Sequence, residues 1–268
     1  MTTLPPKPSR VRSTAIAVVV AAVVLGCAAK LHVNPRDVPS IPANVWHYLV
    51  LMFSHPNWDK FPRALTEMWR SISMAWVGAL LCVIVAIPLG MLAAEGVGPR
   101  WVRLPLRALF AIIRAFPEVI IALILLTVTG LTPFTGALAL AISGIGQQGK
   151  WTYEAVESLH DGSAEAVRAA GGTTAEATRW AYWPAAAPSI LSFALYRFEI
   201  NIRTSAVLGL VGAGGIGSML TNYTNYRKWD TVGMILIVVV IITMVIDAIS
   251  GALRRRIMEG ASGGVGRK

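Results

Sequence analysis

The charged residues of this chain fall in clusters, and long apolar stretches without charge lie between them. Only 14% of the residues are charged and 55% are hydrophobic, whereas about a quarter of an average soluble domain is charged. A helix of about 20 mostly apolar residues crosses the hydrocarbon core of a bilayer, because it satisfies its backbone hydrogen bonds internally. The pattern predicts an all-α membrane protein, excludes a disordered chain and disfavours a soluble domain.

The positions of the charges define six apolar stretches. They cover residues 13–29, 71–94, 105–129 and 134–149, a fifth stretch that begins near Pro184, and residues 231–253. We therefore expect six transmembrane helices. The expected organisation is an N-terminal tail, first span and external loop at 1–66, the main transmembrane domain with a polar loop (150–184) at 67–256, and a C-terminal tail at 257–268.

The Lys and Arg residues predict the orientation of the spans. Six spans place both termini on one side, and cytoplasmic loops carry more Lys and Arg than external loops. With cytoplasmic termini, 14 Lys and Arg residues lie inside, 7 lie outside, and Arg114, Arg197 and Arg203 fall within spans. Both termini are therefore expected in the cytoplasm, with the chain in the cytoplasmic membrane. The net charge of +10 on so apolar a chain indicates membrane lipid as its partner and no nucleic acid.

The N-terminus has an alternative interpretation as a lipoprotein signal peptide. Lys7, Arg10 and Arg12 precede an apolar run that ends in Leu25-Gly26-Cys27. An uncleaved first span is favoured, because Leu25 is bulky next to the cleavage position and the charge balance requires the first span. Cys27 and Cys82 lie inside apolar runs without the spacing of a zinc site or a disulfide framework, so no metal site is predicted.

Two glycine-rich motifs imitate nucleotide sites. Residues 144–150 match a phosphate-binding loop, but Trp151 stands where Mg²⁺ requires a Ser or Thr hydroxyl. Asp247 follows an apolar run, as the Mg²⁺-binding Asp of a nucleotide site follows an apolar strand, but this run is much longer than a strand. Residues 212–217 match G-x-G-x-x-G, but no βαβ unit follows them. We therefore expect this chain to bind no cofactor.

The second glycine motif also has a structural interpretation. Gly209, Ala213 and Gly217 recur at four-residue intervals, so on one helix they would form a face against which another backbone packs closely. The glycines also make this stretch easy to bend. The residues expected to serve helix packing or gating are Gly209, Gly212, Gly214, Gly215 and Gly217.

The polar loop contains Glu165-Ala166-Val167-Arg168-Ala169-Ala170-Gly171, with Pro184 thirteen residues later. Gly171 and Gly172 divide the loop into two short helices, and an ordinary amphipathic loop helix would also explain its composition. The spacing resembles the EAA loop of ABC importer permeases, which docks in a cleft of the ATPase, although Val167 replaces the second Ala. The resemblance implies that the residues coupled to the ATPase are Glu165, Ala166, Arg168, Gly171 and Pro184.

Two further segments resemble phosphonate-type ABC permeases, namely residues 195–217 and Arg114-Ala-Phe-Pro117-Glu118. The similarity covers about residues 64–256. It implies a type I ABC importer permease fold, a homodimer, two copies of a separate ATPase that bind ATP and Mg²⁺, and an external substrate-binding protein. The chain itself would be a non-catalytic transport subunit for phosphonate or a related phosphorus oxyanion, and a permease for methionine or another small solute is the alternative.

Charged side chains within the spans need partners or water, because an ionised group at the bilayer centre costs about 2.5 to 3.5 kcal/mol. Arg114 and Glu118 are four residues apart, as are Glu199 and Arg203, so each pair is predicted to meet on one helical face. Arg197 is then unpaired, and Pro117 favours a kink beside the first pair. Either the pairs lock the third and fifth helices together, or the five residues line a translocation path in which Arg197 attracts an oxyanion.

Two other functional classes are disfavoured. An intramembrane hydrolase requires a nucleophile and a base within the membrane, and the four histidines fall in predicted loops: His32, His47, His55 and His160. A membrane scaffold without transport does not explain charges deep in the spans. A transport subunit is therefore the leading hypothesis.

Overall fold

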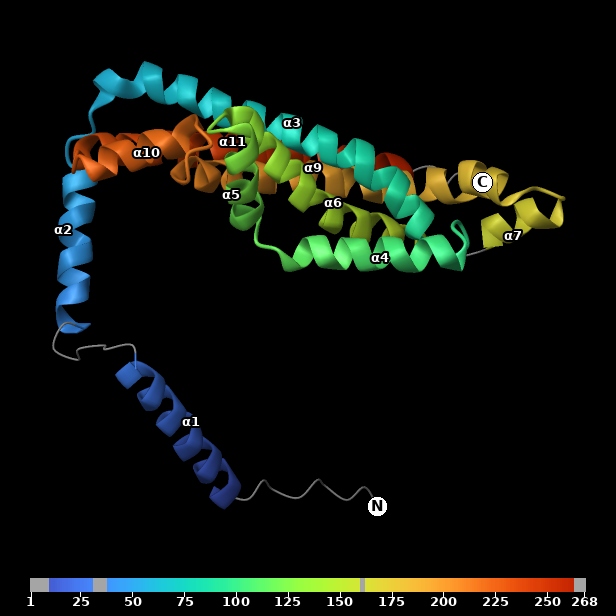
Figure 1. Ribbon diagram of the computed structural model, residues 1–268, viewed down its shortest axis with the longest axis horizontal. Helices are drawn as coiled ribbons and strands as arrows, with labels where there is room; N and C mark the ends of the chain where they lie inside the picture. Colours follow the sequence, from blue (N-terminus) through green and yellow to red (C-terminus); the bar gives the residue numbers. More distant parts are fainter. Residues whose placement is uncertain (1–9, 31–37, 160–161, 263–268) are drawn as a thin grey trace. The chain divides into compact units, whose positions relative to one another are not determined.

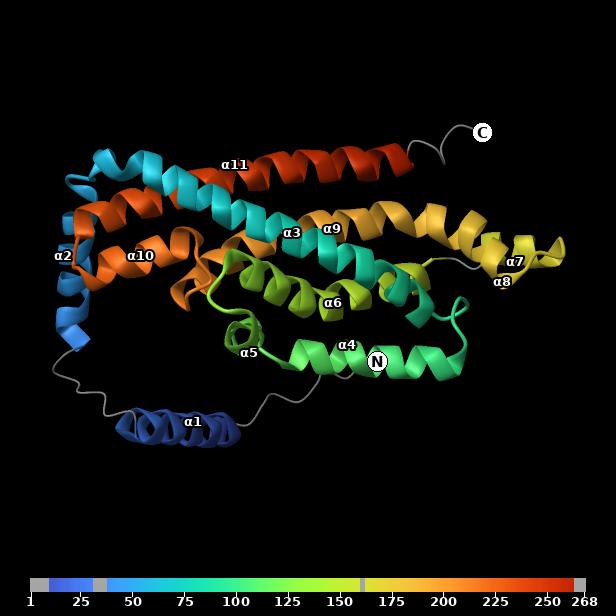
Figure 2. The ribbon, with the colours of Figure 1, turned by 45° about the horizontal axis from the view of Figure 1, so that its top comes forward.

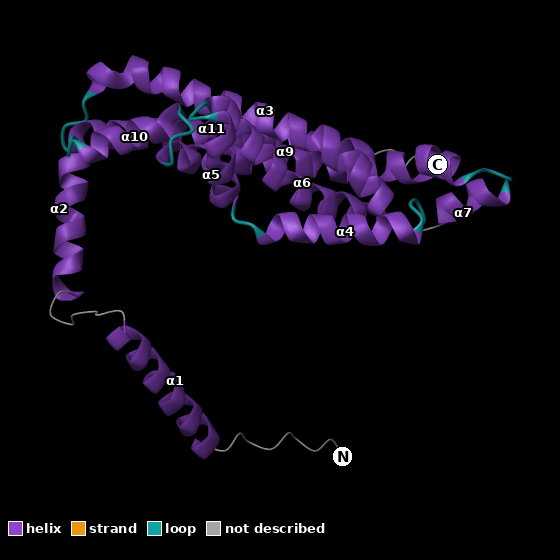
Figure 3. Cartoon of the chain, in the orientation of Figure 1, coloured by secondary structure: helices purple, strands orange, loops and turns teal. Residues whose placement is uncertain are grey.

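The computed structural model describes residues 10–30, 38–159 and 162–262, and every regular element within these ranges is helical (Figures 1 and 3). The predicted all-α architecture is therefore confirmed for this part of the chain. The chain divides into two compact units, residues 1–51 and 52–268. The predictions for Lys7, His32 and His160 concern residues outside the described ranges.

The first unit contains helix α1 (Arg10–Lys30), a 3-10 turn (Val38–Ser40) and most of helix α2 (Ile41–Phe53). The apolar part of α1, Ser13–Cys27, is shorter than a full span, and α2 is also a short apolar helix. Helix α2 lies within the stretch predicted as an external loop. It includes His47, so the prediction that this histidine lies in a loop is wrong.

The second unit is a bundle of long helices with short helices at one end (Figure 2). Its elements are a 3-10 turn (Trp58–Lys60), α3 (Phe61–Ala93), α4 (Arg100–Ala115), α5 (Glu118–Thr129), α6 (Pro133–Glu157), α7 (Gly162–Ala169), α8 (Thr174–Ala177), a π-helical turn (Thr178–Tyr182), α9 (Trp183–Leu210), α10 (Gly215–Asn225) and α11 (Trp229–Ser262). Helix α6 lies at the centre and contacts α3, α4, α5 and α9. Figure 2 shows α7 and α8 at one end of this bundle and α10 at the other.

Small residues allow α6 to occupy the centre. A Cβ atom added to Gly78 of α3 would lie 2.8 Å from Cβ of Leu140 in α6, and one added to Gly146 of α6 would lie 2.8 Å from the backbone oxygen of Phe110 in α4. The helix backbones therefore approach closely, as small residues permit. The glycine motif at 144–150 belongs to this packing face and forms no phosphate-binding loop, and the helix continues beyond its predicted end at Gly149 to Glu157.

The predicted count of six spans is not confirmed. Among the described residues, two helical stretches are long and apolar enough to cross a membrane alone, Trp58–Ala93 and Trp229–Glu259. The bent pairs α4 with α5 and α9 with α10 raise the number to four if each pair forms one span. Helix α6 does not qualify, because a helix surrounded by other helices is rich in small and polar residues where a lipid-facing helix would carry large apolar ones.

Both bends occur where Pro or Gly interrupts a helix. Helices α4 and α5 meet at 88° across Phe116 and Pro117, so the predicted third span at 105–129 is two helices rather than one kinked helix. Helices α9 and α10 meet at 41° across residues 211–214, where Gly212 and Gly214 have φ angles of +101° and +85°. Positions 209, 213 and 217 lie in α9, the turn and α10, so the prediction that they share one helical face is wrong. The predicted close packing of backbones is present, but between α9 and α10: a Cβ atom added to Gly209 would lie 2.7 Å from Cα of Gly217.

Candidate functional site

The α7–α8 segment, residues 162–182, consists of two short helices joined by a glycine turn, as predicted. Gly171 in this turn has a φ of +88°, a conformation that favours glycine. Thr173 caps α8: its backbone N–H donates to the Glu176 carboxylate at 2.6 Å, and its Oγ1 accepts from the Glu176 N–H at 3.3 Å. The Thr173 N–H, and to a lesser extent its hydroxyl, hold the pKa of Glu176 below its ordinary value by stabilising the carboxylate. The Thr-x-x-Glu spacing is the signal that could have predicted this cap.

The structure brings the five residues implicated by the EAA-loop resemblance to the end of the bundle that carries α7 and α8. All five are exposed: Glu165, Ala166, Arg168, Gly171 and Pro184. A Cβ atom added to Gly171 would have no neighbour within 4 Å, so only the backbone conformation requires glycine there. Arg168 Nη2 donates a hydrogen bond to the carbonyl oxygen of Gly96 at 3.1 Å. The segment is thus exposed on one side and attached to the bundle on the other.

Arg197 of α9 is buried and ion-paired, contrary to the prediction that it is unpaired. Its side chain is 4% exposed, and its Nη2 lies 2.8 Å from Oε1 of Glu118 and 2.9 Å from Oγ of Ser143. A continuous helix would keep Glu118 next to Arg114, but the 88° break redirects α5. The predicted Arg114–Glu118 pair is therefore wrong, and Glu118 instead joins α5 to α9.

The other two charges of α9 pair with α11. Oε1 of Glu199 accepts a hydrogen bond from Arg254 at 2.7 Å, and Nη1 of Arg203 lies 3.3 Å from Oδ2 of Asp247. Glu199 and Arg203 are four residues apart in α9, and Asp247 and Arg254 are seven residues apart in α11, so the two residues of each helix share a helical face. Both pairs therefore lie along one line of contact between α9 and α11. The predicted Glu199–Arg203 pair is therefore replaced by two pairs between helices. The seven-residue spacing of Asp247 and Arg254 in α11 is the signal that could have identified the missing partners.

Arg114 lies at the end of α4 with an exposed side chain, and it makes no ion pair within the described residues. Its aliphatic stem lies against α6, since a Cβ atom added to Gly146 would lie 3.0 Å from Cγ of Arg114. The guanidinium can therefore bind an anion or water outside this chain. No group of three or more His, Cys, Asp or Glu side chains within the described residues lies close enough to hold a metal ion.

The glycine-rich turn between α9 and α10 packs against α3 and α6. Oγ of Ser71 accepts a hydrogen bond from the Ile216 N–H at 3.0 Å, and a Cβ atom added to Gly214 would lie 3.4 Å from Pro133.

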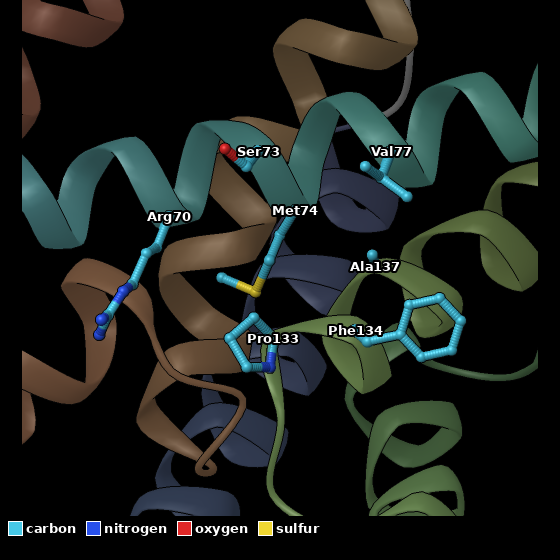
Figure 4. Close-up of a pocket in the computed structure, with 7 residues that line it drawn as sticks. All are labelled: Arg70, Ser73, Met74, Val77, Pro133, Phe134 and Ala137. Atoms are coloured by element: carbon cyan, nitrogen blue, oxygen red, sulfur yellow. The ribbon is translucent and has the colours of Figure 1, made fainter.

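A cavity of about 190 Å³ nearby is lined by Arg70, Ser73, Met74, Val77, Pro133, Phe134 and Ala137 (Figure 4). Met74 reaches from α3 toward Pro133, and Arg70 pairs with Glu67 at 2.8 Å. This mostly apolar cavity therefore offers no cluster of groups for an anion.

Comparison with known proteins relates this arrangement to transport systems. Residues 86–259 match the family model described as "Binding-protein-dependent transport system inner membrane component". The chain is 36% identical over 208 residues to the phosphate-import permease protein PhnE of Mycolicibacterium smegmatis. The aligned region covers 76% of this chain but only 38% of that relative, so the chain spans well under half of the relative's length. It is 31% identical over 216 residues to the putative phosphite transport system permease protein HtxC of Stutzerimonas stutzeri, with 80% and 76% of the two chains covered.

Similarity to methionine permeases is weaker. The chain is 29% identical over 208 residues to the probable D-methionine transport system permease protein MetI of Vibrio cholerae, with 72% and 91% of the two chains covered. Among solved structures, the inward facing MetNI methionine ABC transporter matches with a TM-score of 0.64 at 21% identity, over 70% of this chain and 93% of that chain. This likeness shows the fold, and the predicted ABC importer permease fold is therefore confirmed.

Proposed function

The chain belongs to the family of inner membrane components of binding-protein-dependent transport systems, and from this we propose that it is the transmembrane subunit of an ATP-driven importer of phosphonate or a related phosphorus oxyanion. The relatives named for phosphate and phosphite confirm the predicted resemblance to phosphonate-type permeases. The observation that carries the substrate class is the 31–36% identity to those relatives, against 29% for a methionine permease. The chain itself is a transport subunit and not an enzyme.

Uptake measurements test the substrate class. The complex, purified with its ATPase and binding protein, is reconstituted into vesicles and offered labelled methylphosphonate, phosphite, phosphate or methionine in turn. We expect ATP-dependent uptake of at least one phosphorus oxyanion and none of methionine. Uptake of methionine alone would replace this substrate class with the alternative.

The proposed assembly is a homodimer of this chain with two copies of a cytoplasmic ATPase, which bind ATP and Mg²⁺, and an external substrate-binding protein. In the proposed topology both termini and the α7–α8 segment lie in the cytoplasm, supported by the excess of Lys and Arg on that side. Labelling of a single cysteine placed at Asn57 or Ser163 tests this topology. Asn57 is expected to react from outside and Ser163 only after permeabilisation, and the reverse result would contradict the proposal.

The α7–α8 segment is the proposed docking element for the ATPase. Its support is the exposure of Glu165, Ala166 and Gly171 at one end of the bundle. Helix α9 continues directly from the segment, since Pro184 lies in its first turn. A displacement of the segment by the ATPase would therefore move α9 along with it.

Gly171→Asp tests this docking role. The φ of Gly171 is +88°, a conformation that favours glycine, and the substitution adds a charged side chain at that turn, so the relative placement of α7 and α8 should be disturbed. We expect insertion and assembly to persist while substrate-stimulated ATP hydrolysis falls about tenfold. Gly162→Asp is the matched control, because Gly162 lies in the same segment without a positive φ and with no atom near its Cβ position. Equal stimulation in the two variants would contradict the coupling role of the turn.

Arg114 and Arg203 are the proposed cations of the translocation path. Both are exposed on helices of the bundle, Arg114 near the end of the amphipathic α4 and Arg203 in the more apolar α9, and an ionised side chain that faces lipid costs about 2.5 to 3.5 kcal/mol. A water-filled path or a second copy of the chain is therefore the favoured environment for them. The planar guanidinium donors suit a phosphorus oxyanion. The buried Arg197 and Glu199 and the partly buried Glu118 are instead assigned to holding the helices together.

A further inference from the structure

The α3–α4 connector, residues 94–99, touches the α7–α8 segment although it is distant in sequence. Gly96 and Arg168, which form a hydrogen bond of 3.1 Å, are 72 residues apart. Helix α9 follows the α7–α8 segment directly in the chain, whereas α4 follows the connector. The segment is therefore in contact with the starting points of two different helices of the bundle.

An apolar core joins the connector to the segment. It contains apolar side chains from both parts, most of them small: Ala94 and Val97 from the connector, Ala164 and Val167 from α7, Ala177 from α8, and Ala181 and Tyr182 from the π-helical turn. Ala94, Ala164 and Ala177 have no exposed surface. Because alanine lets the backbones approach closely, the connector and the segment pack directly against each other through this core.

Polar contacts fix the connector at Gly96. The carbonyl oxygen of Gly96 accepts the hydrogen bond from Arg168, and a Cβ atom added to Gly96 would lie only 2.7 Å from the Tyr182 hydroxyl. The φ of Gly96 is +82°, a conformation that also favours glycine. Gly96 is therefore held between α7 and the π-helical turn, with no room for a larger residue.

The connector is in turn attached to the first two turns of α4. Nη1 of Arg103 lies 2.8 Å from Oε1 of Glu95 in the connector, and Nε of Arg107 donates to the carbonyl oxygen of Ala93, the last residue of α3, at 2.9 Å. Arg107 also pairs with Glu157 at the end of α6. The carboxylate of Glu157 in turn accepts a hydrogen bond from the backbone N–H of Glu95 at 2.8 Å. A displacement of the connector is therefore passed to α4 through several contacts.

We propose that the α3–α4 connector is a second mechanical output of the α7–α8 segment, with Arg168 as the positioning residue that fastens it. The inference rests on the proposed function, in which an ATPase displaces the segment. The displacement then moves α4 through the connector as well as α9 through the chain. Helix α4 leads to the break before Glu118, and Glu118 pairs with Arg197 of α9, so the two outputs converge on one ion pair.

Distance measurements between spin labels separate the two outputs. In a complex with Cys27 replaced by Ser, nitroxides at positions 163 and 84 report on the segment, and nitroxides at 104 and 84 report on α4. Ser163, Ile84 and Leu104 are exposed, and Cys82 is buried. Dilution with unlabelled subunits restricts the measurement to distances within one chain. We expect trapping of the ATPase with ADP and vanadate to change both distances in the otherwise unaltered complex.

Gly96→Ala should preserve the change in the 163–84 distance but reduce the change in the 104–84 distance by about half or more, with less uptake per ATP hydrolysed, because its methyl group displaces Tyr182. Arg168→Gln should likewise reduce the change in the 104–84 distance, because it removes the hydrogen bond to Gly96. Arg179→Gln is the matched control. Arg179 is an exposed arginine of the same segment, and its Cζ lies 5.3 Å from the centroid of the Trp180 ring. In this variant the change in the 104–84 distance should persist.

The outcomes distinguish the inference from the function on which it rests. If both distances change fully in Arg168→Gln and in Gly96→Ala, the connector is not an output of the segment, while the coupling role of the segment stands. If the 163–84 distance does not respond to nucleotide trapping in the otherwise unaltered complex, the coupling role fails and the inference falls with it.

Discussion

Helix α9 carries two arginines six residues apart whose ion pairs lie in opposite surroundings. Arg197 is 4% exposed and Glu118 is 26% exposed, whereas Arg203 is 51% exposed and Asp247 is 38% exposed. A buried charge depends on its partner, because removal of the partner leaves it without compensation. An exposed charge can exchange its partner for water or a ligand at little cost. The same residue type on one helix is therefore a structural element at position 197 and a candidate ligand contact at position 203.

Glu118→Gln should have the largest effect. It leaves Arg197, whose side chain is only 4% exposed, without its carboxylate partner, and loss of one member of a pair costs about 3 to 5 kcal/mol when the remaining charge is buried. We expect most of the complex to be lost, measured by size-exclusion chromatography and by the thermal inactivation midpoint. Arg197→Gln combined with Glu118→Gln should recover part of it, because no charge is then stranded. Normal assembly of the single variant would place Arg197 in the same class as Arg203.

The pair between Glu199 and Arg254 should give an intermediate and asymmetric effect. Glu199 is 7% exposed and Arg254 is 32% exposed, so Arg254→Gln strands a buried carboxylate whereas Glu199→Gln frees an arginine that can reach solvent. We expect Arg254→Gln to destabilise the complex by about 1 to 3 kcal/mol and Glu199→Gln by less. Thermal inactivation of the two purified variants measures the difference. Equal destabilisation would show that burial does not decide the cost of breaking these pairs.

The comparison of these pairs also shows what the sequence could predict. The charged positions of α9 and the third predicted span were recognised, because charges in apolar stretches stand out. Their partners were not, because a four-residue spacing predicts a contact only while the helix continues. The break at Phe116 and Pro117 moves Glu118 away from Arg114, and nothing in local spacing shows that it then meets Arg197. Such contacts depend on how the helices pack.

The helices themselves were predictable to different degrees. α3 and α11 face outward along much of their length and therefore carry the long apolar runs that identify a span. The central helix α6 was predicted to end at Gly149, because Lys150 and the polar residues after it suggest a loop, yet it continues to Glu157. Glu157 is held by Arg107 of α4, so tertiary contacts extend the helix beyond its apolar run. The two short helices of the α7–α8 segment were predicted from their glycine turn, which is a local signal.

Arg203→Gln and Asp247→Asn should have the smallest effect on stability and the clearest effect on transport. Both side chains are more than a third exposed, and exposed ion pairs contribute about 0 to 1 kcal/mol, so both variants should assemble normally. Arg203→Gln should lower the uptake of an anionic substrate per assembled complex, because it removes an attractive cation from the proposed path. Asp247→Asn should leave that uptake unchanged or higher, because Arg203 then loses the carboxylate that competes with the substrate. Equal loss of uptake in both variants would mean that the pair acts as a structural unit, and the distinction between Arg197 and Arg203 would fail.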